Sequence, residues 1–98
     1  MNNKIDKFMQ NKGINPKYRG YYTLRQIILN WETENNKTKL LVNIASQNET
    51  SMWKLRKNIV LALKDSAFNS YCTLTSIELF HTLYLDFLNY LGSEENDN

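Results

Sequence analysis

Apolar residues recur at helical spacing in the middle of the chain and predict two short helices joined by a tight turn. In residues 39–47 the apolar positions fall on one side of a 3.6-residue period and form a narrow face. The second helix starts after Thr50 or Ser51, both favourable N-caps, and runs to about residue 64. Between the helices we expect Asn48 to supply the left-handed conformation that a sharp turn needs.

The second of these helices has two faces of different character. Its inward face carries apolar residues at i, i+3, i+7, i+10 and i+11: Met52, Leu55, Ile59, Ala62 and Leu63. Its outward face is basic and almost free of acids: Trp53, Lys54, Arg56, Lys57, Val60 and Lys64. A supporting helix, a short turn and a basic second helix are the parts of the helix-turn-helix that reads the DNA major groove. We therefore expect such a unit at about residues 39–64.

The distribution of charge favours this interpretation over an ordinary helical bundle, which also contains amphipathic helices joined by short turns. All 12 Lys and Arg residues lie in residues 1–64, where four acids reduce the net charge to +8. Residues 65–98 hold six acids and no base, which gives −6. The overall charge of +2 thus conceals a basic segment that includes the candidate recognition helix, and the segregation favours a nucleic-acid partner.

The rest of the chain also favours helices. With 42% hydrophobic residues, three glycines, one proline and few alternating β-branched runs, the expected fold is all-α and globular. Gly13 and Gly92 are expected to end helices, and Thr75 to Glu78 form a capping box that begins one. The further helices are predicted at residues 4–12, 21–34 and 75–91. We expect one helix-turn-helix domain of residues 1–92 and a disordered acidic tail of residues 93–98.

The predicted last helix is apolar over more than one inward stripe. Part of it must therefore be sunk between other helices or covered by another copy of the chain. We expect a homodimer, or tandem copies on DNA, that pair through a subset of its apolar and aromatic residues: Leu79, Leu83, Phe87 and Tyr90.

Side chains that could support catalysis or metal binding are isolated in the sequence. His81 has no Cys or acidic pair at metal-ligand spacing, so we expect it at a polar edge of the core. Cys72 is the single cysteine, which excludes an internal disulfide, and is expected to be a buried or half-buried thiol. We expect no enzyme activity, metal or cofactor. With no signal peptide and no long uncharged apolar run, the expected location is the cytoplasm.

Residues from about Gly13 to Ala67 form an ordered set of matches to a known family. The set comprises Gly13-Ile14, Gly20-Tyr21-Tyr22-Thr23-Leu24-Arg25, Ile28, Ile44-Ala45, Thr50-Ser51, Lys54-Leu55, Ile59 and Ala62-Leu63. It resembles the C-terminal DNA-binding effector domain of the stage zero sporulation protein A family, the response regulators that initiate sporulation. The resemblance implies an all-helical domain that binds duplex DNA, with adjacent copies in contact through their C-terminal helices. It places the following residues on the groove-facing part of the recognition helix: Ser51, Lys54, Arg56 and Lys57.

The sequence also departs from that family. Arg56 stands where the family's groove-facing helix has an acid, and Val60 stands where it has a base. Because an acid reads the cytosine amino group whereas Arg reads guanine O6 and N7, we expect a different DNA site. The chain holds no receiver domain, so its activity is expected to be constitutive or set by concentration or a partner.

The expected function is sequence-specific binding of double-stranded DNA by a small transcriptional regulator. Ser51, Lys54, Arg56 and Lys57 are expected to read bases, and Trp53 to lie over a sugar-phosphate edge or a neighbouring side chain. Phosphate contacts are expected from outlying groups: Lys17, Arg19, Tyr21, Lys39 and Lys64. Two alternatives remain open. One is a plasmid or phage accessory protein that marks an origin or transfer site, and the other is a protein-interaction module that antagonises a larger regulator through the last helix.

Overall fold

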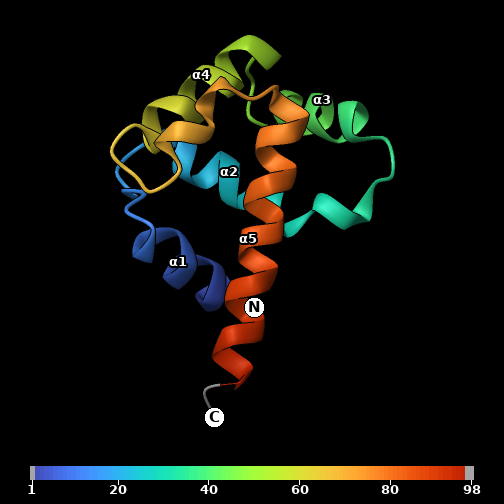
Figure 1. The fold of residues 1–98 in the computed structure, drawn as a ribbon. Coiled ribbons are helices and arrows are strands. Elements are labelled where there is room, and N and C mark those ends of the chain that lie inside the picture. The colour runs from blue at the N-terminus through green and yellow to red at the C-terminus, as the bar shows by residue number, and fades with distance from the viewer. Residues whose placement is uncertain (1, 97–98) are drawn as a thin grey trace.

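The computed structural model describes residues 2–96. Within this range the chain is all-α and contains no strand, which confirms the expected fold class (Figure 1). The elements follow one another in this order: α1 (Asn2–Asn11), α2 (Arg19–Leu29), the 3-10 helix η1 (Trp31–Thr33), α3 (Lys37–Gln47), α4 (Met52–Leu63), the 3-10 helix η2 (Asn69–Thr73) and α5 (Ser76–Asn96).

The end of α1 is set by Gly13, as predicted. This residue has a φ of +86°, and its N–H donates to the carbonyl of Gln10 at 3.0 Å. The N–H of Ile14 donates to the carbonyl of Met9 at 3.0 Å. The two bonds form a Schellman motif, which satisfies carbonyls that the end of a helix would otherwise leave free.

The second helix is shorter than the sequence predicted, because it ends at Leu29 rather than near residue 34. The side-chain amide of Asn30 donates to the carbonyl of Gln26 at 2.8 Å, and the chain then tightens into η1. The tighter turn buries Trp31, whose indole Nε1 donates to Nδ1 of His81 on α5 at 3.1 Å. His81 therefore lies at the polar edge of the core, as expected.

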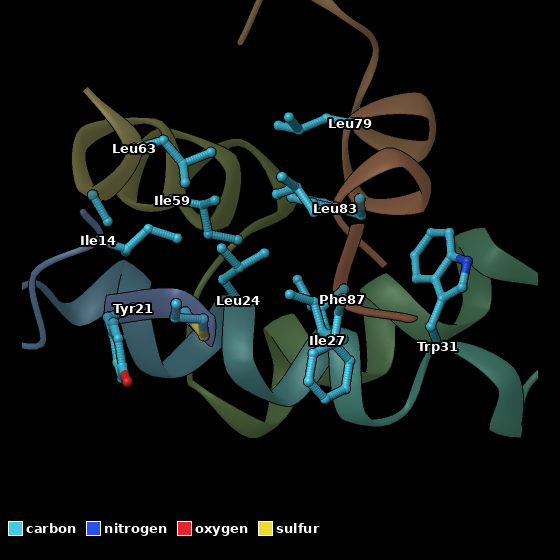
Figure 2. Close-up of a cluster of buried hydrophobic side chains, with 14 of the residues drawn as sticks. Ile14, Tyr21, Leu24, Ile27, Trp31, Ile59, Leu63, Leu79, Leu83 and Phe87 are labelled. Carbon is cyan, nitrogen blue, oxygen red and sulfur yellow. The ribbon is translucent and has the colours of Figure 1, made fainter. Parts of the chain in front are cut away.

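The core lies where α2, α4 and α5 meet. Figure 2 shows side chains from all three helices converging on one apolar centre: Leu24 and Ile27 from α2, Ile59 and Leu63 from α4, and Leu79, Leu83 and Phe87 from α5. All of them are buried. The outward face of α4 is thus held by a rigid inner face, as a binding helix requires.

Three of the residues predicted to pair two chains belong to this core. Leu79 and Leu83 have no exposed surface and Phe87 is 3% exposed, so they cannot contact a second folded copy. Tyr90 is half-buried, with its ring 5.5 Å from that of Phe8. The prediction is therefore wrong for Leu79, Leu83 and Phe87, because the sequence showed a surplus of apolar positions on this helix but not which of them the rest of the chain would cover. Pairing through Tyr90 stays a prediction. The large apolar side chains that α5 leaves exposed are Ile77, Leu85 and Leu88.

The backbones of α2 and α4 meet at Gly20. A Cβ at this position would collide with the carbonyl group of Asn58 and would lie 2.8 Å from Cα of Ile59. Only a residue without a side chain permits so close an approach. Gly20 therefore fixes how α4 lies across the domain.

The last helix begins as predicted but continues further. The hydroxyl of Thr75 accepts from the N–H of Glu78 at 3.4 Å and donates to the Glu78 carboxylate at 2.6 Å, so the predicted capping box is only partly formed. The helix does not end at Gly92, which lacks the positive φ of a helix-ending glycine. Of the predicted disordered tail, residues 93–96 belong to α5 and residues 97–98 lie outside the described range.

Tyr21 contributes to the core rather than to the predicted phosphate contacts. It is 1% exposed, and its hydroxyl donates to the Asp6 carboxylate at 2.6 Å. The Nε of Arg25 donates to the same oxygen at 3.1 Å. The expected phosphate contact is wrong, because the amphipathic period of α2 turns this ring inward against α1.

Stability at alkaline pH should depend on this buried phenol. Burial and the Asp6 carboxylate raise the pKa of Tyr21 above its ordinary value of 10.0. The neutral phenol is therefore favoured in the fold, and its contribution to stability, complete below about pH 10, is lost as the pH rises through the raised pKa. The free energy of unfolding, measured in urea above pH 10, should fall less steeply with rising pH for Tyr21→Phe than for the wild type. For Tyr22→Phe, whose ring is exposed, it should fall as steeply as for the wild type. If the unfolding free energy of the wild type and of both variants depended equally on pH, the raised pKa of the Tyr21 phenol would be contradicted.

Candidate nucleic-acid interface

A four-residue turn joins α3 to α4. The N–H of Glu49 donates to the carbonyl of Ser46 at 3.0 Å, and the N–H of Thr50 donates to that of Ala45 at 2.9 Å. The left-handed residue in this second Schellman motif is Glu49, with a φ of +54°, and not Asn48 as predicted. The reason is that the Asn48 side chain donates to the carbonyl of Ile44 at 2.7 Å, which keeps Asn48 at the end of α3.

The N-cap of α4 is Ser51, so the structure decides between the two residues that the sequence offered. Its hydroxyl accepts from the N–H of Lys54 at 3.2 Å. The side chain is exposed and retains its own O–H as a donor. Ser51 is thus available at the helix start, although one lone pair is already engaged by the cap.

The inner face of α4 is as predicted, with Leu55, Ile59, Ala62 and Leu63 buried and Met52 half-buried. The opposite side presents side chains that are all exposed and include no acid, and we refer to them as the outer face of α4: Trp53, Lys54, Lys57, Leu61 and Lys64. Trp53 is 68% exposed, and the Nζ of Lys57 lies 5.0 Å from the centre of its ring. An exposed indole beside an ammonium group can stack on an apolar edge while the ammonium group binds an anion.

Arg56 does not belong to this outer face, although the sequence placed it there. Its Nη2 donates to the carbonyls of Cys72 at 2.9 Å and Leu74 at 2.7 Å, and its Nη1 donates to the hydroxyl of Ser76 at 3.0 Å. The side chain is half-buried against η2 and the start of α5. The expectation of an outward-facing Arg56 is therefore wrong. A helical period gives the angle of a residue but not which angles a later segment will cover.

Three of the residues predicted to contact phosphate precede α4 in the sequence: Lys17, Arg19 and Lys39. Arg19 is exposed and directly precedes Gly20, whose backbone approaches Asn58 and Ile59 of α4. Lys17 is exposed in the preceding connector, with its Nζ 5.3 Å from the ring of Tyr18. Lys39 is exposed in the first turn of α3, with its Nζ 3.8 Å from the Glu34 carboxylate. Lys39 is therefore the one of these three cations that has an acidic partner within the described residues.

Side chains that could hold a metal ion are not grouped in the described part of the chain. Within residues 2–96, no three His, Cys, Asp or Glu side chains are placed to hold a metal ion. Cys72 is half-buried, as expected, and burial raises the pKa of its thiol while the charge of Arg56 opposes the rise. No helix in the described part of the chain is long and apolar enough to cross a membrane.

Comparison of the chain with protein-family models, curated proteins and solved structures finds no match. The functional argument therefore rests on the arrangement of the side chains.

Sequence reasoning missed two residues of this arrangement. Leu61 was not assigned to the outer face, and Gly20 was not recognised as the point where α2 meets α4. The signal for Leu61 was its helical angle, which lies between those of Lys54 and Lys57.

Proposed function

We propose that the protein binds double-stranded DNA by inserting the outer face of α4 into the major groove. The observation that carries this proposal is a helix whose inner side is fixed in the core and whose outer side exposes three lysines and a tryptophan, with no acid among them. In Figure 1, α4 lies at the end of the molecule opposite to the C-terminus of α5. An α-helix with its side chains is about 10–12 Å wide and fits a groove of about 12 Å.

Each side chain on this face has a role that its chemistry supports. Lys54 and Lys57, within two turns of the helix start, can donate to guanine O6 and N7 or to phosphate. Lys64, at the far end of α4, suits a phosphate contact. Trp53 offers a flat apolar ring to a sugar edge or to a thymine methyl group. Arg56 is given no part in base reading, because its half-buried guanidinium already makes three hydrogen bonds within the chain.

A salt titration of duplex binding tests the proposal. A random-sequence duplex should bind the wild-type chain at low salt, and the logarithm of the binding constant should fall linearly with the logarithm of salt concentration. Lys57→Ala should weaken binding and reduce that slope by about 1, because one phosphate contact is lost. The control is Lys7→Ala, which removes the same charge from the exposed side of α1.

Two results would contradict the proposed interface. One is the absence of duplex binding by the wild-type chain even at low salt. The other is an equal effect of Lys7→Ala and Lys57→Ala, because unspecific attraction to a basic protein depends on total charge rather than on position. Selection of bound duplexes from a random pool would then show whether the binding is sequence-specific, as a transcriptional regulator or an origin-marking protein of a plasmid or phage requires.

A second candidate function is protein interaction through α5. The observation that favours it is the exposed apolar set Ile77, Leu85 and Leu88, each between 42% and 45% exposed. Beside Leu88 lies a hollow of about 160 Å³ between α2, η1 and α5, lined mainly by apolar side chains. The partner can be a second copy, which would give a pair on DNA, or a larger regulator. Light scattering from the free chain at increasing concentration distinguishes these, since only self-pairing doubles the mass.

A further inference from the structure

Arg56 makes the most extensive side-chain contact of α4 with the later part of the chain. Its guanidinium bonds three acceptors that lie 16 to 20 residues further along the sequence. Two are backbone carbonyls, of Cys72 and Leu74, and one is the hydroxyl of Ser76 in the first turn of α5. A planar guanidinium with five N–H donors can satisfy such a fan of acceptors, whereas a single ammonium group cannot do so in the same geometry.

The segment that Arg56 holds is otherwise fixed by partly buried apolar side chains that pack against the core: Tyr71, Cys72 and Leu74. None of the η2 residues is buried, and the nearest fully buried neighbour on its N-terminal side is Phe68. The segment lies within residues 65–98, the part of the chain that holds no Lys or Arg. The three bonds from Arg56 therefore add a polar tie that joins the junction between η2 and α5 to the side of α4.

We propose that Arg56 is a positioning residue for the DNA interface. It holds the junction of η2 and α5 against the side of α4, so that the outer face is presented clear of the backbone carbonyls and acids of the later chain. It acts through this geometry and does not touch DNA. The proposal rests on the proposed function, and it assigns a binding role to a residue outside the binding face.

The test compares Arg56→Lys with Lys57→Ala in the same salt titration, on a duplex selected for tight binding. Arg56→Lys keeps the positive charge but loses the fork of donors, so affinity should fall about tenfold while the salt slope stays that of the wild type. Lys57→Ala should instead lower the slope by about 1. Hydrogen exchange of the Arg56→Lys chain should be faster in residues 69–76 and unchanged in α4, which a general loss of stability would not produce.

The contact itself is tested by Ser76→Ala, which removes one acceptor but leaves the N-terminal hydrogen bond of Thr75 in place. Its effect on affinity should not add to that of Arg56→Lys, because the second change removes part of an interaction already lost. All binding is measured at a temperature where circular dichroism shows each variant folded.

The outcomes separate this inference from the function on which it rests. An Arg56→Lys chain with unchanged affinity would overturn the positioning role. A slope lowered by about 1 in Arg56→Ala, with Arg56→Lys at wild-type affinity, would make Arg56 a phosphate contact and would also overturn it. If the wild-type chain binds no duplex while Arg56→Lys still speeds exchange in residues 69–76, the proposed function and the binding role both fail, and Arg56 is only a structural tie.

Discussion

Gly20→Ala should be among the most damaging single substitutions in the chain. The added methyl group would lie closer than 3.0 Å to backbone atoms of Asn58 and Ile59, and backbone cannot rotate away as a flexible side chain can. The helices α2 and α4 would have to separate, and the core between them would open. Overpacking of a core costs about 1–3 kcal/mol, and a collision of two backbones should reach at least the upper end of that range. The total free energy of unfolding of a domain of this size is roughly 5–15 kcal/mol.

Urea unfolding followed by circular dichroism measures this loss, and Gly92→Ala is the matched control. Gly92 lies within α5, and a Cβ added there would have no neighbouring atom within 4 Å, so the same substitution should stabilise the helix by about 0.5–1 kcal/mol. The changes in unfolding free energy caused by Gly20→Ala and Gly92→Ala are therefore expected to have opposite signs. A Gly20→Ala chain as stable as the wild type would mean that α2 and α4 do not approach in this way.

Ile59→Ala should destabilise the protein by about 2–5 kcal/mol, because it leaves a cavity at the centre of the core. Ile59 has no exposed surface and lies between α2 and α5, where Figure 2 shows it facing Leu24. Thermal unfolding measures the effect. The control on the same helix is Leu61→Ala, whose side chain is exposed and whose loss should change stability by less than about 0.5 kcal/mol.

The comparison of these two variants also tests the orientation of α4. If Leu61→Ala proved as damaging as Ile59→Ala, the inner and outer faces of the helix would be assigned incorrectly. The proposed interface would then lose its basis, because its side chains are defined by that orientation. The stability experiment thus bears on the functional proposal without requiring a DNA sequence.

The sequence by itself determined the elements whose causes are local. The glycine end of α1, an N-cap of α4 at Thr50 or Ser51, and the inward positions Leu55 and Ile59 all follow from the conformational preference or the period of neighbouring residues. The all-α class follows in the same way. The segregation of charge was also visible in the sequence, although the DNA-binding role inferred from it stays a proposal.

Only the tertiary structure decided which of several similar residues are covered. Leu83 and Leu88 have the same side chain on the same helix, yet the first is buried in the core and the second is exposed. Arg56 and Lys57 are adjacent cations, yet the junction of η2 and α5 occupies the side of α4 that bears Arg56. The physical reason is that a helical period fixes relative angles within one helix, whereas burial depends on contacts between segments far apart in the sequence, such as the meeting of α2 and α4 at Gly20.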